Sequence, residues 1–125
     1  MRVIIIGGVA GGMSAATRLR RLDESAEIIV LEKSGHVSYA NCGLPYYVGG
    51  VIENEKDLLL QTPASLHARF RLDVRVSTEV LAINPDKKVV AIKNLITGET
   101  SEMDYDKLIL SPGASPVVPP IPGIE

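Results

Sequence analysis

The sequence predicts an α/β fold, in which a parallel β-sheet built on one βαβ unit carries an inserted three-stranded antiparallel β-meander. Two observations lead to this prediction. A β-branched run at residues 2–6 is followed by a glycine-rich turn, a helical pattern and a second apolar run, which is the order expected of a βαβ unit. Over residues 79–104, three strand-like segments are separated by short turns, as in a meander.

The N-terminal elements follow from their apolar patterns. Residues 2–6 are followed directly by two glycines and have the composition of a strand that is buried on both faces. Residues 11–23 fit an amphipathic helix. Its inward positions are predicted to be Ala15, Ala16, Leu19 and Leu22, and its mostly outward positions Arg18, Arg20, Arg21 and Asp23. A second strand is expected over residues 26–31, and residues 33–60 are expected to be irregular.

The later elements are separated by prolines and glycines. Thr62 is expected to cap a short helix that begins at Pro63 and runs to Phe70, since proline is favoured at the first helical position. Residues 74–76 are predicted to form a third parallel strand. The meander strands are expected over residues 79–84, 88–94 and 99–104, and residues 107–110 should return as a further strand.

The composition excludes several classes of protein. A chain of 125 residues with 46% hydrophobic and 22% charged residues is typical of one small globular domain. A net charge of −2 argues against a general binder of nucleic acid or of membrane surfaces, and the apolar runs are too short for a transmembrane helix. A single cysteine cannot form an internal disulfide, which fits a reducing cytoplasm. His36 and His67 have no companion ligands in the sequence, so we expect no metal site.

The turn at residues 7–12, Gly-Gly-Val-Ala-Gly-Gly, is a candidate nucleotide site because it follows a strand and opens a helix. Backbone amides at a helix start lack partners, and the helix dipole favours an anion there. Glu32 ends the second strand, where it is placed to accept hydrogen bonds from a ribose. Val9 breaks the strict Gly-x-Gly-x-x-Gly spacing, although Gly8 and Gly11 still let a pyrophosphate approach. The alternative is a tight turn without a ligand.

Cys42, the only cysteine, lies downstream of this turn in the segment 38–49. A thiol without a second cysteine, beside a dinucleotide site, predicts single-cysteine redox chemistry; the alternative is a small buried core residue. Because no second cysteine is present, this segment cannot relay electrons through an internal disulfide. Such a thiol works through a mixed disulfide with a small-molecule thiol or through a sulfenic acid.

Three segments give the sequence a family resemblance. They are residues 6–16 (Ile-Gly-Gly-Val-Ala-Gly-Gly-Met-Ser-Ala-Ala), 38–46 (Ser-Tyr-Ala-Asn-Cys-Gly-Leu-Pro-Tyr) and 105–116 (Tyr-Asp-Lys-Leu-Ile-Leu-Ser-Pro-Gly-Ala-Ser-Pro). In them the chain resembles the N-terminal part of the flavoprotein pyridine nucleotide-disulfide oxidoreductases. The resemblance is greatest to the coenzyme A (CoA) disulfide reductase and NADH-dependent persulfide reductase branch. It implies a Rossmann-like FAD-binding fold, with residues 1–125 as the N-terminal portion of the FAD-binding domain.

The resemblance also implies roles for individual residues. Cys42 is the expected catalytic thiol, which would form a mixed disulfide with CoA or a persulfide and be reduced by NADH or NADPH through FAD. FAD would be held by Gly7, Gly8, Val9, Ala10, Gly11, Gly12, Glu32, Lys33, Asn41, Val80, Ser111 and Gly113. CoA would be held by Ser14, Arg18, Arg21, Ser38, Asn41, Arg69 and Arg71. The alternative for each arginine is a solvated surface charge.

The proline-rich end at residues 119–125 is typical of the start of a linker. We therefore expect a fragment whose nicotinamide-binding and dimerisation domains lie outside this chain, and which has no NAD(P)H-dependent turnover alone. The full-length protein is expected to be a cytoplasmic homodimer that acts on a small-molecule disulfide or persulfide. Two alternatives stay open: an NADH oxidase or peroxidase that cycles Cys42 through a sulfenic acid, and a non-catalytic flavin-binding module if the chain is complete.

Overall fold

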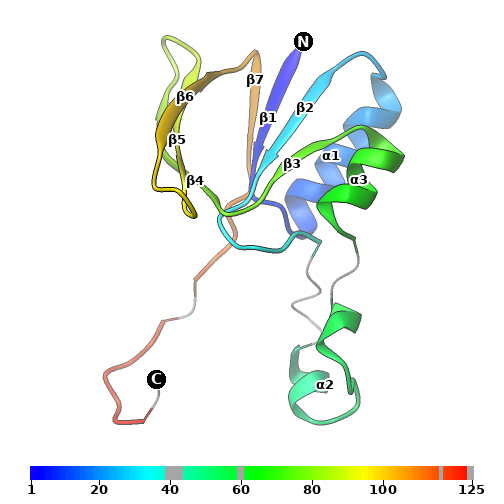
Figure 1. Cartoon of the computed structure of the whole chain (residues 1–125), viewed down its shortest axis with the longest axis vertical. Coiled ribbons are helices and arrows are strands. Elements are labelled where there is room, and N and C mark those ends of the chain that lie inside the picture. Colours follow the sequence, from blue (N-terminus) through cyan, green and yellow to red (C-terminus); the bar gives the residue numbers. More distant parts are fainter. Residues whose placement is uncertain (39–43, 59–60, 116, 124–125) are drawn as a thin grey trace.

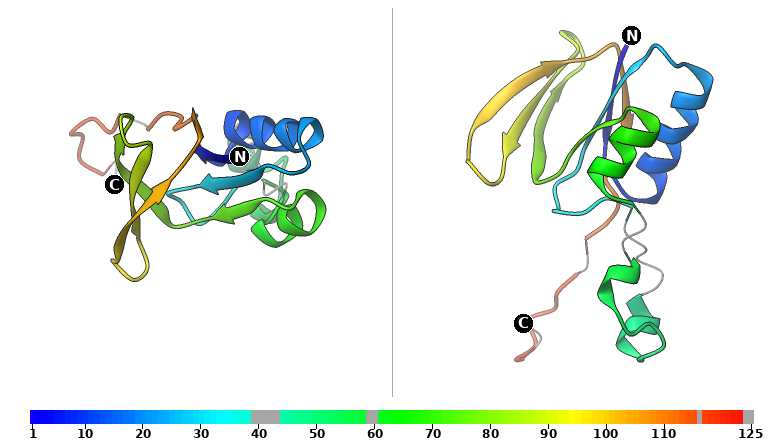
Figure 2. Two further views of the ribbon diagram at one scale, coloured as in Figure 1. Left: turned by 90° about the horizontal axis from the view of Figure 1, so that it is seen from above. Right: turned by 45° about the vertical axis from the view of Figure 1, so that its right-hand side comes forward.

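The computed structural model describes residues 1–38, 44–58, 61–115 and 117–123, and its main body has three layers (Figure 1). Two helices cover one face of a four-stranded parallel sheet, and a three-stranded antiparallel sheet lies against the other face (Figures 1 and 2). The predicted α/β fold with an inserted meander is therefore confirmed.

The parallel sheet has the strand order β3-β2-β1-β7. Strand β1 (Arg2–Ile6) is hydrogen-bonded on one side to β2 (Glu27–Leu31) and on the other to β7 (Lys107–Leu110). Strand β3 (Asp73–Arg75) extends the sheet beyond β2. Because the strands are parallel, their carboxyl ends meet at one edge of the sheet, which is where ligands bind in open α/β sheets.

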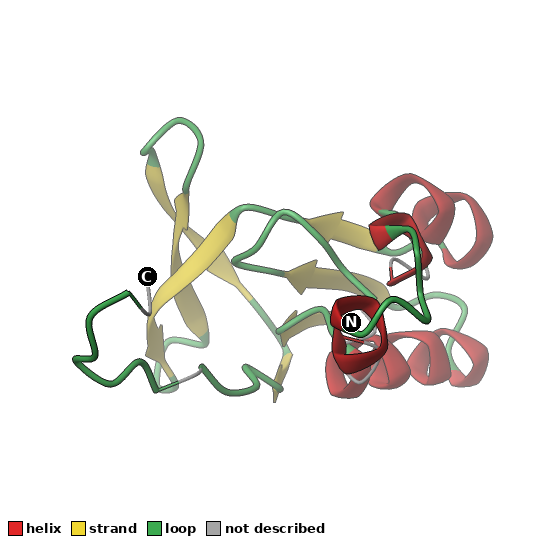
Figure 3. Ribbon diagram, turned by 90° about the horizontal axis from the view of Figure 1, so that it is seen from below, coloured by secondary structure: helices red, strands yellow, loops and turns green. Residues whose placement is uncertain are grey.

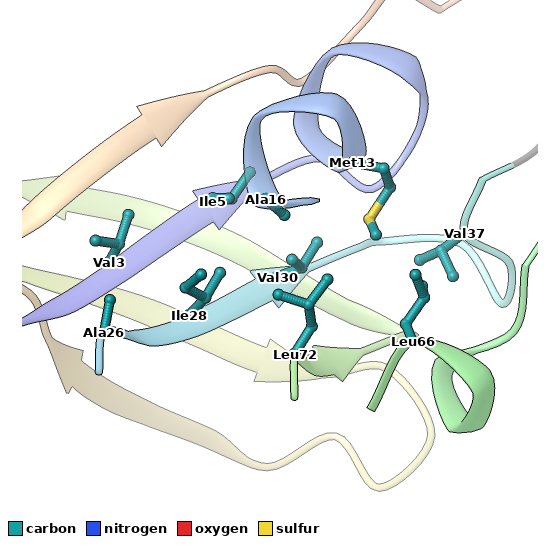
Figure 4. Close-up of a cluster of buried hydrophobic side chains, with 10 residues drawn as sticks. All are labelled: Val3, Ile5, Met13, Ala16, Ala26, Ile28, Val30, Val37, Leu66 and Leu72. Atoms are coloured by element: carbon teal, nitrogen blue, oxygen red, sulfur yellow. The ribbon is translucent and has the colours of Figure 1, made fainter. Parts of the chain in front are cut away.

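Alternate side chains of β1 and β2 serve two separate cores, as the two-residue period of a strand requires. One core lies under the helices α1 (Ala10–Leu22) and α3 (Pro63–Phe70) and is drawn in Figure 4. It contains Val3, Ile5, Met13, Ala16, Ala26, Ile28, Val30, Val37, Leu66 and Leu72. The other core faces the meander and contains Ile4, Ile29, Leu31, Val90 and Ile92. Burial on both faces explains why residues 2–6 are almost continuously apolar.

The meander consists of β4 (Thr78–Asn84), β5 (Val89–Asn94) and β6 (Thr100–Asp104), in the antiparallel order β4-β5-β6. Figure 3 shows it as a sheet apart from the parallel one. It is inserted between β3 and β7, and its middle strand, β5, supplies Val90 and Ile92 to the second core. The three predicted strands are confirmed, each with a boundary shifted by one residue.

Helix α3 is capped by Thr62 and begins at Pro63, as predicted. The Thr62 hydroxyl accepts a hydrogen bond from the Ser65 amide (3.1 Å), and the Ser65 hydroxyl accepts one from the Thr62 amide (3.0 Å). Pro63 follows as the first helical residue, where its missing N–H costs nothing. Leu66 is buried and anchors the helix in the first core.

Helix α1 begins at Ala10, one residue before the predicted start, and two of its side chains lie opposite to the prediction. Arg20 is buried, whereas Leu22 is 68% exposed. The inward stripe of the helix runs through Met13, Ala16 and Arg20. These positions are three and four residues apart and so share one face, from which position 22 points away. The predictions of an outward Arg20 and an inward Leu22 are therefore wrong.

The buried guanidinium of Arg20 is satisfied entirely by backbone oxygens. It donates to the carbonyls of Ala26 (2.6 Å), Phe70 (2.8 Å), Glu24 (3.0 Å), Arg71 (3.1 Å) and Asp23 (3.3 Å). Burial lowers the pKa of Arg20 from its ordinary value, and the positive charge of Arg71 acts in the same direction. Arg20 thereby joins the C-terminal ends of α1 and α3, which explains why a charged residue occupies the inward stripe.

Part of the segment predicted to be irregular is helical. A short helix, α2 (Leu44–Val48), and a 3-10 helix (Glu55–Leu58) lie between β2 and α3, so the prediction for residues 33–60 is wrong there. Pro45 is tolerated because it lies in the first turn of α2. In the described ranges, no helix combines the length and the apolar composition that crossing a membrane requires.

Candidate nucleotide-binding site

Three loops meet at the carboxyl edge of the parallel sheet, after β1, β2 and β7. Together they line a cavity of about 680 Å³. Among its lining residues are seven of the predicted cofactor-binding positions: Val9, Ala10, Gly11, Glu32, Lys33, Ser111 and Gly113. Residues that lie far apart in the sequence are thus brought to one edge of the sheet.

Two glycines of the glycine-rich segment at residues 7–12 are required by close packing. Gly7 has φ +104°, and a Cβ atom there would overlap the carbonyl oxygen of Ser111 in the loop after β7. A Cβ at Gly12 would overlap the carbonyl oxygen of Gly7, so Gly12 lets α1 pack closely on the end of β1. The amide of Ser111 donates to the carbonyl of Ile6 (2.8 Å). The first and last loops of the site are therefore held directly against each other.

The N-terminus of α1 opens onto this cavity. Val9 is the residue before the helix, no side chain caps the helix there, and its first turn has no acidic residue. Ala10 and Gly11, in that first turn, line the cavity. The first amides of a helix have no partners within it and attract anions. The loop is therefore suited to a phosphate group even though Val9 replaces the middle glycine of the strict motif.

Glu32 has a role in the loop that the sequence did not reveal. Its Oε1 accepts a hydrogen bond from the amide of Gly8 (2.9 Å), and its Oε2 accepts one from the amide of Ser34 (2.8 Å). A carboxylate has about four lone-pair sites, so both oxygens can still accept from a ligand. Glu32 thus fixes the glycine-rich loop while lining the cavity, and its contact with a ribose stays a prediction.

The meander closes the site on another side. Val80 lines a smaller cavity of about 180 Å³ together with Gly7, Glu32 and Pro112. Lys33 forms an ion pair with Glu79 (3.5 Å) across the end of β4. Leu95 lines the larger cavity. Its position there depends on how the meander packs, so no local pattern in the sequence identifies it as a site residue.

The segment that leads to Cys42 starts at this loop. Val37 is buried in the first core, and the amide of Ser38 donates to the carbonyl of Gly8 (2.8 Å). Ser38 has φ +51°, which is uncommon for a residue other than glycine. The next predicted site residues, Asn41 and Cys42, lie outside the described residues. The structure brings Ser38 to the glycine-rich loop, and the roles of Asn41 and Cys42 stay predictions.

Apart from Ser38 and Asn41, the predicted CoA residues fall into two groups. Ser14, Arg18 and Arg21 are all exposed and lie at positions i, i+4 and i+7 of α1, hence on one side of the helix. Arg69 lies over the ring of Phe70, 5.2 Å from its centre. Arg71 donates to the carbonyl of Glu24 (2.9 Å), beyond the C-terminal end of α1. The structure therefore places Arg71 at the end of α1 that is remote from the glycine-rich loop.

Among the described residues, no three histidine, cysteine, aspartate or glutamate side chains gather as a metal site would require. The features of this edge that suit a ligand are the free helix start, the closely packed glycines and the carboxylate of Glu32. These are the features of a dinucleotide site in an α/β fold.

Comparison with known proteins agrees with this geometry. The sequence model of the family described as pyridine nucleotide-disulphide oxidoreductase matches residues 1–125. The chain is 46% identical to a coenzyme A disulfide reductase of Staphylococcus epidermidis over 114 residues, which are 91% of this chain and 26% of that protein. This chain thus spans about a quarter of the length of that curated relative.

Two solved structures are similar as well. The reduced CoADR-RHD of Bacillus anthracis is 55% identical, with a TM-score of 0.93 over 98% of this chain and 22% of the other. A NAD-dependent persulfide reductase from A. fulgidus is 40% identical, with a TM-score of 0.92 over 100% of this chain and 23% of the other. Because the family match extends from the first residue to the last, the chain belongs to the pyridine nucleotide-disulphide oxidoreductase family.

Proposed function

We propose that this chain forms the N-terminal portion of the FAD-binding domain of a NAD(P)H-dependent reductase. Its substrate would be CoA disulfide, or a CoA persulfide or polysulfide, and Cys42 its single redox thiol. The observation that carries the proposal is the hydrogen bond from the Ser38 amide to the Gly8 carbonyl (2.8 Å). It ties the segment that continues to Cys42 to the loop suited to a dinucleotide. The similarity to a coenzyme A disulfide reductase and to a persulfide reductase supports the substrate class.

The residues at the carboxyl edge fit FAD. The amides at the start of α1 would hold its pyrophosphate, because no acidic side chain in the first turn competes for them. Glu32 would accept from its ribose, and the backbone near Val80 would lie at its adenine end. Ser111 and Gly113, which also line the cavity, would contact the flavin side. When bound, FAD passes electrons from a nicotinamide to a sulfur centre.

Cys42 supplies the sulfur chemistry. Its thiolate attacks one sulfur of CoA disulfide, which forms a Cys42–S–S–CoA bond and releases one CoA thiolate. Two electrons from NAD(P)H would then break this bond and regenerate the Cys42 thiolate, and bound FAD would supply this redox chemistry. The second CoA leaves as a thiol after taking up a proton. With a CoA persulfide, the same attack transfers the outer sulfur to Cys42, and two electrons and two protons release it as hydrogen sulfide.

The exposed side of α1 supports an anionic substrate. Ser14, Arg18 and Arg21 present a hydroxyl and two guanidinium groups on one side of the helix, and guanidinium groups bind phosphate strongly. Arg69 and Arg71 carry less weight, because they contact the Phe70 ring and the Glu24 carbonyl, respectively. We therefore assign the phosphates of CoA to Arg18 and Arg21 first.

The test is NADH oxidation by the full-length, flavin-loaded protein in the absence of oxygen, because this chain alone is expected to have no NAD(P)H-dependent turnover. Addition of CoA disulfide should start NADH consumption and release two CoA thiols for each NADH. The Cys42→Ser variant should bind FAD normally and show no turnover. If NADH consumption instead requires oxygen or peroxide and ignores CoA disulfide, the proposal is wrong and the protein is an oxidase or peroxidase. If neither substrate is used, it is a flavin-binding module.

A further inference from the structure

Gly8 contacts two segments that follow it at some distance along the chain. Its amide donates to Oε1 of Glu32 (2.9 Å), and its carbonyl accepts from the amide of Ser38 (2.8 Å). No side chain fits at this position, because a Cβ there would lie 2.7 Å from Cγ1 of Val37 and 3.2 Å from Cβ of Glu32. The φ angle of Gly8 is not positive. It is therefore space, rather than backbone conformation, that requires glycine here.

The segment at residues 37–38, which contacts Gly8, is held firmly. Val37 is 1% exposed, and Figure 4 shows it near Leu66 in the first core, the one under α1 and α3. Ser38 follows with φ +51°. A residue other than glycine keeps such a conformation only when its surroundings impose it. Here the surroundings are the buried side chain of Val37 and the hydrogen bond to Gly8, so Val37 and Ser38 are held in place.

We propose that Gly8 is a positioning residue that couples the flavin loop to the cysteine segment. A ligand bound at the start of α1 would fix Gly8 and, through one hydrogen bond and one side-chain contact, fix Val37 and Ser38. Occupancy of the glycine-rich loop would thereby set the reactivity of Cys42, which follows Ser38 closely in the chain. This inference rests on the proposed function, because it takes FAD as the ligand and Cys42 as the reactive thiol.

The experiment measures how FAD changes the rate at which N-ethylmaleimide alkylates Cys42. The rate is followed by mass spectrometry of the Cys42 peptide, in the holoprotein at saturating FAD and after removal of the flavin. Bound flavin is measured by absorbance in each sample. The variants are Gly8→Ala, Val37→Ala and the double variant. Gly35→Ala is the matched control, because a Cβ at Gly35 has no heavy atom within 4 Å and its φ is not positive.

In the wild-type protein and in Gly35→Ala, we expect FAD to change the alkylation rate by about fivefold or more, the range of typical coupling between two sites. In Gly8→Ala with FAD bound, the effect should fall below about twofold. Val37→Ala should also reduce it, because Val37 no longer packs on Gly8. The double variant should recover most of the effect, since the methyl group introduced at position 8 fills the space that Val37 leaves.

The inference is overturned if FAD does not change the rate in the wild-type protein, or if Gly8→Ala with bound FAD keeps the full effect. It is also overturned if the two single effects simply add in the double variant, because residues in contact should couple. If Gly8→Ala binds no FAD, the inference is judged from the effect of FAD on the alkylation rate in Val37→Ala and in the double variant. Alkylation needs neither CoA nor NADH. A normal FAD effect without any CoA-dependent turnover would therefore refute the proposed substrate and leave the coupling intact.

Discussion

The amide of Gly8 donates a 2.9 Å hydrogen bond to Oε1 of Glu32, so the carboxylate at the end of β2 holds the loop that follows β1. The same carboxylate accepts from Ser34 through Oε2. A residue predicted to contact a ribose is thus also a structural part of the loop, and its loss should affect the empty protein as well as ligand binding.

Glu32→Gln tests this double role. A glutamine offers one oxygen and one NH₂ group, so either Gly8 or Ser34 would face a donor in place of an acceptor. An unsatisfied partly buried amide costs about 1–3 kcal/mol. We expect this loss in the free energy of unfolding of the FAD-free protein, measured by chemical denaturation, and weaker FAD binding. Glu53→Gln, at an exposed site outside the cavity, should change neither value. Equal stability of the two variants would show that the Glu32 carboxylate does not hold the loop.

Gly12→Ala tests the close approach of α1 to β1. The added methyl group would overlap the carbonyl oxygen of Gly7, which is backbone and cannot turn away. Overpacking of this kind costs about 1–3 kcal/mol. We expect lower stability and loss of bound flavin, measured by thermal unfolding and by the ratio of flavin to protein absorbance. Gly35→Ala is again the control. Normal flavin content in Gly12→Ala would mean that the loop tolerates a wider separation.

Arg20→Met tests whether the buried guanidinium joins the two helices. The substitution keeps an unbranched side chain but leaves the carbonyls of Ala26, Phe70 and Arg71 without this donor. Because each buried unsatisfied group costs about 1–3 kcal/mol, the free energy of unfolding should fall by several kcal/mol. Arg18→Met, at an exposed position of the same helix, should change it by less than about 0.5 kcal/mol. Similar losses in both variants would contradict a special role for Arg20.

Arg18→Ala and Arg21→Ala test the assignment of the CoA phosphates. Each should raise the KM for CoA disulfide by about tenfold or more, as expected from losing a charge-assisted hydrogen bond of about 1.5–3 kcal/mol. The value of kcat and the flavin content should stay unchanged. Arg75→Ala removes an exposed arginine that pairs with Asp73 and serves as the control. An unchanged KM in both α1 variants would show that this side of the helix is only a solvated surface.

The sequence is sufficient to predict those features that depend on local patterns. The two-sided burial of β1, the start of α3 at Thr62 and Pro63, and the meander all follow from residues close together in the chain. The gathering of Glu32 and the glycine-rich loop at one edge also follows, once the two strands are taken as parallel neighbours.

Other features depend on contacts between distant segments. Arg20 is buried because the carbonyls of three segments converge on it, and the charge of an arginine gives no sign of this. Leu95 reaches the cavity because the turn after β5 is held beside the start of β4, where the Leu95 amide donates to the carbonyl of Ser77 (2.8 Å). The bond between Ser38 and Gly8 likewise needs the three-dimensional course of the loop after β2.

The proposed function requires Cys42 to form a mixed disulfide with CoA while FAD is bound. Its most direct test is mass spectrometry of the Cys42 peptide from the flavin-loaded protein, treated with CoA disulfide and digested without reductant. We predict that the peptide gains the mass of one disulfide-linked CoA and loses it when NADH or a thiol reductant is added before digestion. A peptide that stays unmodified, or that gains only oxygen atoms, would contradict the claim.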